Sequence, residues 1–304
     1  MAGSEASIII KDLSKRYDSS NTFALDKLSI SVKPGEVYGF LGPNGAGKST
    51  TIRLLMNFIQ PTSGQATILG KDIVRGSVDI KKSVGYLTGD GEMYPKMTGR
   101  QYLAYLNDLQ PAKSQTYINQ LAKRFKADLN KKLGELSRGN RQKINIVQAF
   151  MHQPNIFILD EPTSGLDPLM QEEFYELIKE VKARGATVFT SSHILGEVQK
   201  MCDRVGIIRD GRLVAERSIK EMAHEAAQTF VITFVGEAPI NNLKKVHGVK
   251  IVNHDNNIAT IHVHGQLSPL FAVLAKHNVT NVEARSLDLE EVFLRFYQNE
   301  AVKK

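Results

Sequence analysis

The sequence predicts an α/β protein, in which a mixed α/β core carries a helical insertion and a second, smaller α+β unit follows. Three observations lead to this prediction. Short apolar strands alternate with helical segments from residue 7 to about residue 215. Between residues 97 and 151 the apolar spacing is helical, and a new strand begins near Thr229. Because the chain has 304 residues, we expect two domains, at residues 1–217 and 218–304.

Each expected strand of the first domain is a short apolar run bounded by turn residues. These strands span residues 7–10, 28–32, 35–41, 64–69, 84–87, 156–160, 187–191, 204–209 and 212–215. Asp210-Gly211 separates the last two strands and is a strong two-residue hairpin signal. In the insertion, two apolar stripes at helical spacing predict helices, and they comprise Tyr102, Leu103, Tyr105 and Leu106, and then Ile118, Leu121, Ala122 and Phe125.

The second domain is expected to be a small ferredoxin-like sandwich, because its elements follow the order βαββαβ. They are strand 229–235, helix 240–246, hairpin strands 248–253 and 258–264, helix 269–277 and strand 279–285. We expect a partly helical linker at residues 218–228 and an amphipathic helix at residues 289–297. His254, His262 and His264 are interpreted as residues of an exposed sheet face rather than metal ligands, since no acid or cysteine completes the set.

The composition is that of an ordinary globular protein, with 42% hydrophobic and 23% charged residues. The formal net charge is +7, but the Lys and Arg residues are scattered, so we expect no nucleic-acid partner. The sequence has no apolar run of about 18 residues and no secretion signal, so we expect a cytoplasmic protein. The single cysteine, Cys202, excludes an internal disulfide and is expected to pack as a small hydrophobic residue.

A phosphate-binding loop is the most informative motif of the chain. The stretch that fits the pattern G-x-x-x-x-G-K-[ST] is Gly42-Pro43-Asn44-Gly45-Ala46-Gly47-Lys48-Ser49-Thr50. In such a loop the backbone N–H groups surround a phosphate chain, Lys48 reaches the β- and γ-phosphates, and the Ser49 hydroxyl is placed to ligate Mg²⁺. An apolar strand precedes the loop and a helix follows it, so the phosphates are expected at a helix N-terminus.

Two adjacent acids, Asp160 and Glu161, follow the apolar run at residues 156–159. Such a run predicts a strand buried on both faces. Downstream of a phosphate-binding loop, Asp160 is expected to hold Mg²⁺ opposite Ser49. Glu161 is then expected to point towards the γ-phosphate, where a carboxylate can orient and polarise the attacking water.

In this order, the motifs of residues 7–215 resemble those of the nucleotide-binding subunit of ABC transporters. The phosphate loop matches Walker A, and residues 156–160 match Walker B, with Glu161 at the catalytic glutamate position. Residues 164–167 resemble the D-loop, and His193 resembles the switch histidine. Residues 136–140 occupy the position of the signature sequence. The resemblance implies ATP and Mg²⁺ as ligands and ATP hydrolysis as the activity. It implies catalytic roles for Lys48, Glu161 and His193, with Ser49 and Asp160 at the metal.

The family resemblance also implies a head-to-tail dimer that closes over ATP. In that dimer, Ser137 and the N–H of Gly139 of one subunit face the γ-phosphate bound by the other subunit. The resemblance places Asp167, which ends the D-loop, among the nucleotide-binding residues. It places Tyr17 where the family keeps an aromatic residue that stacks on adenine.

Two departures from the family pattern stand out. The signature has Arg138 and Asn140 where the family usually has Gly and Gln, so we expect a kept function with changed affinity or dimer coupling. The Q-loop glutamine of the family corresponds to Gly89, which has no side chain to reach a metal or water. We expect the loop to keep a mechanical role, with Asp90 as a candidate substitute for the lost side chain.

Residues 93–98 and 286–294 resemble the ATPases of bacterial ABC-2-type exporters, the group that includes drug and antibiotic resistance pumps. The implied function is the energising of a membrane permease on a separate chain, for export of a drug, peptide, lipid or similar compound. The implied partners are that permease and a second nucleotide-binding subunit, expected to be another copy of this chain. The implied location is peripheral, on the inner face of the cell membrane.

Two other functions use the same loop. A soluble ABC-type ATPase acting on nucleic acid or the ribosome usually carries two cassettes or a long coiled coil, and this chain has neither. A small-molecule kinase would have no use for residues 136–140, residues 164–167 or His193. The transport function is therefore preferred over both.

Overall fold

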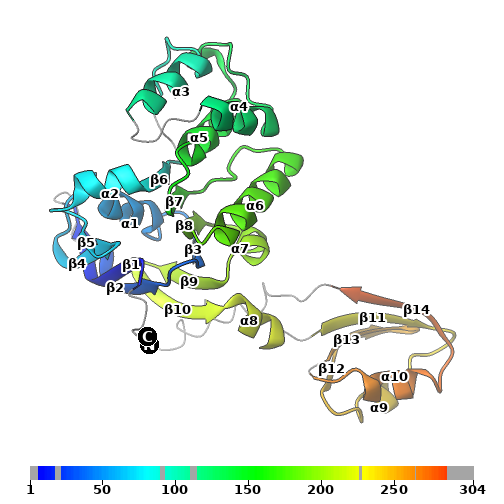
Figure 1. Ribbon diagram of the computed structural model, residues 1–304. Helices are drawn as coiled ribbons and strands as arrows, with labels where there is room; N and C mark the ends of the chain where they lie inside the picture. The colour runs from blue at the N-terminus through cyan, green and yellow to red at the C-terminus, as the bar shows by residue number, and fades with distance from the viewer. Residues whose placement is uncertain are drawn as a thin grey trace. The chain divides into compact units, whose positions relative to one another are not determined.

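The computed structural model describes residues 6–17, 22–89, 93–109, 115–225, 228–263 and 265–285. The chain divides into two compact units, Met1–Arg217 and Ser218–Lys304 (Figure 1). The first unit contains two sheets and a group of helices, and the described residues of the second form one sheet and three helices. None of the described helices is both long enough and apolar enough to cross a bilayer.

The main sheet of the first unit has six strands in the order β10-β9-β3-β8-β7-β6. Their bounds are β3 Val37–Leu41, β6 Val84–Leu87, β7 Ile156–Asp160, β8 Thr187–Ser192, β9 Arg204–Arg209 and β10 Arg212–Ser218. All described pairs among β9, β3, β8, β7 and β6 are parallel, and every residue of β3, β7 and β8 is buried. The predicted turn at Asp210-Gly211 joins β9 to β10, and both of its residues have positive φ angles.

A second, antiparallel sheet has the strand order β2-β1-β4-β5, with β1 Ile8–Arg16, β2 Phe23–Val32, β4 Ser63–Ile68 and β5 Lys71–Asp72. The sequence predicted β1 and β2 as shorter strands, because beyond their most apolar parts both continue as residues of mixed burial that form no apolar run. Neither β5 nor the helix α2 (Ser77–Ser83) was predicted, since both are short and mostly exposed.

Helix α1 (Lys48–Leu55) packs into the core that holds both sheets together. Its Ile52 and Leu55 are fully buried in one cluster with Ile8 of β1 and Phe40 of β3. Figure 1 shows α1 on one side of the main sheet and the helices α6 (Pro168–Ala183) and α7 (Leu195–Met201) on the other. The sheet is therefore covered on both faces, which is why its central strands are apolar throughout.

The predicted insertion at residues 97–151 is helical. It contains α3 Gly99–Asp108, α4 Gln115–Arg124, the short 3₁₀ helix η1 Leu133–Glu135 and α5 Arg138–Phe150. Thr98 caps α3 in a reciprocal capping box with Gln101, which fixes where the helix begins. The apolar stripe predicted for α4 is buried, whereas Tyr105 of the α3 stripe is exposed and packs edge-on against Tyr94.

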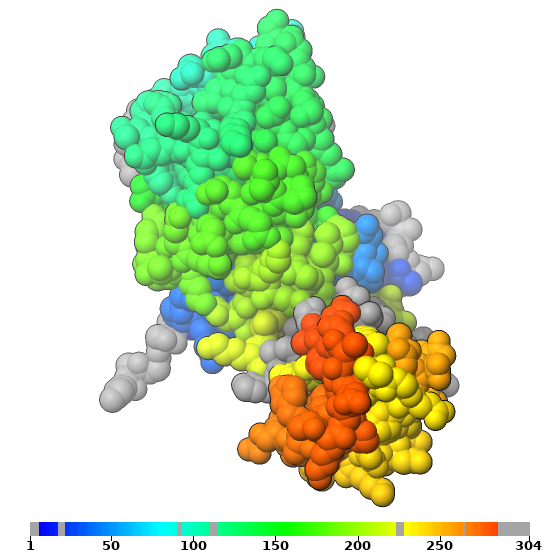
Figure 2. All heavy atoms as spheres, turned by 90° about the vertical axis from the view of Figure 1, so that its right-hand side faces the viewer, coloured from blue at the N-terminus to red at the C-terminus, as the bar shows by residue number. Residues whose placement is uncertain are grey.

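The second unit has the predicted order of elements: β11 Gln228–Phe234, α9 Ile240–Leu243, β12 Val249–Asp255, β13 Ile258–Val263, α10 Ser268–Leu274 and β14 Val279–Arg285, preceded by α8 Ile219–Glu225. Its sheet is antiparallel with the order β12-β13-β11-β14. Phe230, Ile232, Ile261 and Leu270 are buried in its own core. Figure 2 shows one outer face of this unit, coloured yellow to red. The predicted helix at 289–297 lies outside the described residues.

Two smaller predictions concern chemistry outside the loop region. Cys202 is free and buried, and its Sγ packs beside Gly39 of β3, so it serves as a small hydrophobic residue as predicted. Among the described residues, no three His, Cys, Asp or Glu side chains are grouped to hold a metal, and His264 lies outside them.

The aromatic packing behind β7 provides a test of the fold. The Phe157 ring is fully buried and stacks on Phe150, with 4.4 Å between ring centroids. Phe157→Ala is expected to lower the free energy of unfolding by about 3–5 kcal/mol, because a cavity forms beneath the sheet. Leu169→Ala, at a side chain that is 72% exposed, is the control and should change it by less than about 0.5 kcal/mol. Equal urea denaturation midpoints for both variants would contradict this packing.

Candidate active site

The loop between β3 and α1 depends on glycine at two positions. A Cβ on Gly42 would lie 2.4 Å from the carbonyl oxygen of Ile208. Gly47 has a φ of +111°, and a Cβ there would lie 2.7 Å from the carbonyl oxygen of Ala24. Neither backbone neighbour can move away without disturbing a strand. The loop therefore holds its conformation only with glycine at both ends.

Lys48, the first residue of α1, lies across the loop. Its Nζ donates hydrogen bonds to the carbonyl oxygens of Gly42 (2.7 Å) and Pro43 (3.2 Å). It also lies 3.4 Å from Oε1 of Glu161, and its side chain is only 5% exposed. A buried ammonium group needs such partners. They keep the charge at the start of α1, where the helix dipole also favours anions.

The two acids lie where β7 ends. Asp160 is 8% exposed, and its Oδ1 accepts a hydrogen bond of 2.6 Å from the hydroxyl of Ser191. The same Ser191 hydroxyl accepts a hydrogen bond of 3.0 Å from the backbone N–H of Glu161. The end of β8 thus fixes both acids through one side chain, because β7 and β8 are parallel with Asp160 paired to Ser191.

Glu161 adopts a left-handed backbone conformation, with a φ of +45°. Such a conformation costs a residue other than glycine about 1–3 kcal/mol and persists only where the surroundings enforce it. It directs the carboxylate so that Oε1 lies 3.1 Å from Nδ1 of His193 as well as 3.4 Å from Lys48. The structure therefore brings together the three side chains that the sequence predicted as catalytic.

A cavity of about 360 Å³ lies beside these side chains. It is lined by Asn44, Ser49, Arg53, Tyr86, Thr88, Gly89, Arg138, Asp160, Glu161 and Ser164. The hydroxyl of Ser49 and the carboxylate of Asp160 are hard oxygen donors of the kind that Mg²⁺ prefers. Their presence in one polar cavity fits a magnesium ion held between α1 and β7.

The predicted signature residues lie at the start of α5. Ser137 caps the helix, since its hydroxyl accepts a hydrogen bond from the N–H of Asn140. A Cβ on Gly139 would lie 2.7 Å from the carbonyl oxygen of Gly165, so this helix end packs directly on the residues after Glu161. Arg138 donates a hydrogen bond of 3.0 Å to the hydroxyl of Ser164.

Asp167 and Tyr17 lie outside the cavity. Asp167 caps α6 by accepting a hydrogen bond from the N–H of Met170, and its other oxygen lies 3.8 Å from Nζ of Lys143. The ring of Tyr17 is partly exposed, with the Nζ of Lys15 5.4 Å from its centroid. Within the part of the chain that the structure describes, neither residue forms a hydrogen bond or ion pair with Lys48, Glu161 or His193. Any contact of theirs with a bound nucleotide would therefore involve a different part of that nucleotide.

At the predicted Q-loop position, Gly89 lies against Asp160. A Cβ placed there would meet the carbonyl oxygen of Asp160 at 3.4 Å, which is an ordinary contact. The cavity thus has room for a longer side chain that this sequence does not supply. Asp90, the candidate substitute, lies outside the described residues.

Three residues that sequence analysis did not single out hold the backbone around the acids: Ser191, Gln142 and Glu197. Gln142, in α5, donates a hydrogen bond of 2.7 Å to the carbonyl oxygen of Pro162. Glu197, in α7, accepts hydrogen bonds from the hydroxyls of Thr163 and Ser192. The Ser-Ser pair before His193 was the one available sequence signal, while nothing in the pattern distinguished Gln142 or Glu197 from surface residues.

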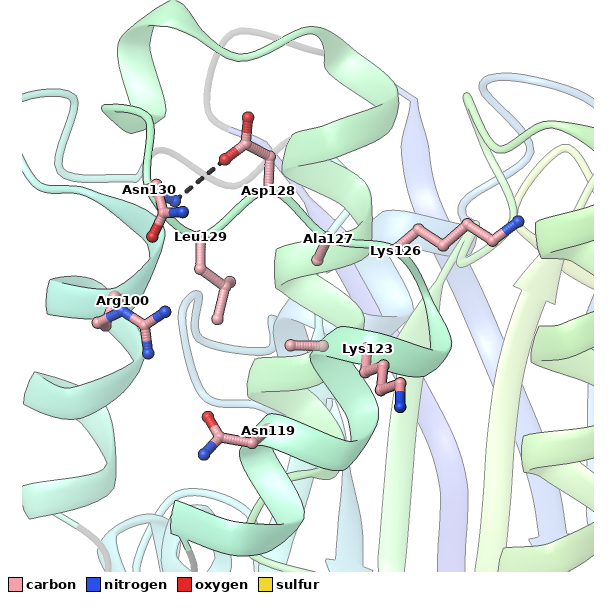
Figure 3. A pocket seen from close by; sticks show the side chains of 9 residues that line it. Arg100, Asn119, Lys123, Lys126, Ala127, Asp128, Leu129 and Asn130 are labelled. Atoms are coloured by element: carbon pink, nitrogen blue, oxygen red, sulfur yellow. Dashed lines mark hydrogen bonds between the residues drawn. The ribbon is translucent and has the colours of Figure 1, made fainter.

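A second hollow, of about 300 Å³, lies in the helical insertion between α3 and α4. It is lined in part by Arg100, Asn119, Lys123 and Lys126. Figure 3 shows the side chain of Lys126 directed away from Arg100 and Asn119, so the basic groups do not converge on one point. This hollow therefore lacks the geometry of the cavity beside Glu161.

Comparison with known proteins places these features in context. The sequence profile described as "ABC transporter" matches residues 25–164. The bacitracin transport ATP-binding protein BcrA of Bacillus licheniformis is 40% identical over 215 residues, which are 69% of this chain and 70% of that protein. The ABC transporter ATP-binding protein NatA of Bacillus subtilis is 35% identical over 224 residues, covering 71% of this chain and 91% of that protein.

Solved structures agree in fold. An ATP-binding subunit of an ABC transporter is 29% identical with a TM-score of 0.65, covering 72% of this chain and 92% of that chain. A dimeric ATP-binding cassette bound to ADP and phosphate has a TM-score of 0.64 at 22% identity, covering 70% of this chain and 98% of that chain.

The open space at Gly89 gives a test of the Q-loop departure. Gly89→Gln is expected to fold with an unchanged melting temperature, because its Cβ meets only an ordinary contact with Asp160. If the loop acts mechanically, ATP turnover should change by less than about twofold, a difference worth under 0.5 kcal/mol. Gly42→Ala is the contrasting variant, since its Cβ clashes with the backbone, and it should lose nucleotide binding. A large rise in turnover for Gly89→Gln would show that the missing side chain limits hydrolysis.

Proposed function

The chain belongs to the ATP-binding proteins of ABC transporters, and from that membership we propose that it energises an exporter whose permease is a separate chain. As a member of that family it binds and hydrolyses ATP. The observation that supports a hydrolytic site most directly is the convergence of Lys48 and His193 on one oxygen of Glu161. A loop that only bound phosphate would not need a carboxylate held in a strained backbone conformation.

The site residues divide the reaction between them. Residues 42–50 surround the phosphates, with Lys48 on the β- and γ-phosphates and adenine against Tyr17. Ser49 and Asp160 would hold Mg²⁺, which would supply positive charge for the phosphate oxygens when bound. Glu161 orients the attacking water and accepts its proton, and His193 steadies both the water and the γ-phosphate.

Lys48 and Glu161 are also linked by charge. Before ATP binds, the Lys48 ammonium faces the Glu161 carboxylate at 3.4 Å. A bound phosphate chain draws that ammonium away, because it offers more negative charge at the same loop. Glu161 then exchanges its contact with Lys48 for one with the attacking water.

A second copy of the chain would complete each site. Ser137 and Gly139 lie at a helix N-terminus that faces the opposing phosphate in a head-to-tail pair. ATP then acts as part of the interface, and its hydrolysis loosens the pair and drives motion in a partner. The dimeric cassette among the similar structures supports this pairing.

The partner is proposed to be a membrane permease, with this chain bound peripherally at the inner face of the membrane. Relatives are named for bacitracin transport and, in Escherichia coli, as a probable multidrug transporter protein that is 33% identical over 73% of this chain. Those names favour export of a drug-like compound over action on nucleic acid.

Glu161→Gln tests the water-orienting role. The amide keeps the size of the side chain but cannot accept a proton, so kcat for ATP should fall by about 10²–10⁴-fold. ATP binding should persist and accumulate an ATP-bound dimer, visible by size-exclusion chromatography with multi-angle light scattering. Turnover equal to that of the natural protein, measured with or without permease, would refute the role of Glu161.

Lys48→Ala tests the phosphate contact. Removing a charge-assisted hydrogen bond costs about 1.5–3 kcal/mol, so ATP affinity should fall by roughly 10- to 150-fold. Isothermal titration calorimetry of the purified chain measures this loss. Lys179→Ala, which removes an exposed lysine from α6, is the matched control and should bind ATP normally. Equal affinity for both variants would contradict the proposed site.

A further inference from the structure

Glu197 is a buried carboxylate outside the proposed set of catalytic residues. It lies in α7 and is only 7% exposed. It makes no ion pair with any residue of the described segments, so no cation compensates its burial. An unpaired buried carboxylate is costly unless hydrogen bonds satisfy it. Its two oxygens therefore depend on the hydroxyl groups that surround them.

Those hydroxyls come from the two segments that carry the catalytic pair. Thr163 donates to Oε1 at 2.5 Å, and Ser192 donates to Oε2 at 2.6 Å. Thr163 stands two residues after Glu161, and Ser192 stands directly before His193. Both hydroxyl-bearing residues are almost fully buried, so water does not compete for these bonds. One carboxylate thus bridges the segment after β7 and the end of β8.

The Ser192 hydroxyl extends this bridge around His193. It accepts a hydrogen bond of 3.0 Å from the N–H of Ile194 and lies 3.3 Å from the carbonyl oxygen of the same residue. The residues before and after His193 are therefore tied together, and Glu197 anchors that tie. On the other side, the Thr163 contact restrains the short turn that begins at the strained backbone of Glu161.

We propose that Glu197 is a positioning residue for ATP hydrolysis, which holds Glu161 and His193 at the separation their reaction requires. The inference rests on the proposed function of that pair. The Glu161–His193 contact of 3.1 Å joins the residue after β7 to the residue after β8. Both residues lie beyond the paired parts of these strands, so the sheet register alone does not set their separation. The bridge through Glu197 supplies the missing restraint. The bridge affects the rate of the chemical step and does not alter the contacts of the phosphate loop with the nucleotide.

The test is steady-state ATPase kinetics of the full chain, with its permease where turnover requires it. Glu197→Ala and the near-isosteric Thr163→Val each break the bridge, so kcat should fall by about 10- to 100-fold, the effect of a small misplacement of reacting groups. The KM for ATP should stay within about twofold of that of the natural protein. Thr163→Val keeps the side-chain volume, so it reports on the bridge even where Glu197→Ala fails to fold.

Two further variants separate positioning from bulk stability. Glu197→Gln should recover most of kcat, because its carbonyl accepts from Thr163 while its amide donates to Ser192, whose own proton turns to the carbonyl of Ile194. The double variant Glu197→Ala with Thr163→Val should be no slower than either single variant, since both cut one bridge. Glu176→Ala, at an exposed glutamate of α6, is the control and should match the natural protein.

Four outcomes would each overturn the proposal. The folded Thr163→Val variant keeps its kcat, or KM rises in place of a fall in kcat. Alternatively, Glu197→Gln is as slow as Glu197→Ala, or the losses in the double variant are fully additive. Failure of the proposed function has a different signature. In that case Glu161→Gln would keep its turnover, or the natural chain would hydrolyse no ATP, whatever the Glu197 series shows.

Discussion

The parallel register of β3, β8 and β7 is the constraint on which the site depends. Leu41 pairs with Ser192, and Ser191 pairs with Asp160, so the three strands end at the same edge of the sheet. The phosphate loop follows β3, Glu161 follows β7 and His193 follows β8. Their side chains meet because the strands stop together, and α1, buried between the two sheets, fixes the loop against that edge.

Within that frame, polar groups rather than apolar packing set the final geometry. Glu161 is held in a left-handed conformation by the Ser191 hydroxyl on one side and by the hydrogen-bonded turn that follows it on the other. Buried polar networks of this kind are rigid when every member is satisfied. Here the satisfied members are hydroxyls and amides placed next to the charged groups, which lets the acids stay close without a stabilising cation for each.

The sequence allowed the main parts of this arrangement to be predicted, because phosphate-loop and strand-end motifs are local patterns. Lys48, Asp160, Glu161 and His193 could be singled out from such patterns, and the structure places Lys48 and His193 against Glu161, with Asp160 next to it at the end of β7. Predictions failed where the pattern was weak or the contact was tertiary. The exposed β5 and α2 lack apolar periodicity, and the roles of Gln142 and Glu197 depend on a neighbour far along the chain, to which single-sequence periodicity is blind.

Helix α5 contacts the residues around Glu161 at two places within its first two turns. Ser137 and Gly139 lie at its start, and Gln142 donates a hydrogen bond to the carbonyl oxygen of Pro162, the residue after Glu161. A helix held in this way moves together with the segment that it contacts, here the residues after β7. In the proposed head-to-tail pair, release of phosphate from one pocket would move α5 of the opposite copy and, through the contact of Gln142 with Pro162, the segment that carries that copy's Glu161. Hydrolysis would then alternate between the two sites, and α5 alone would couple them.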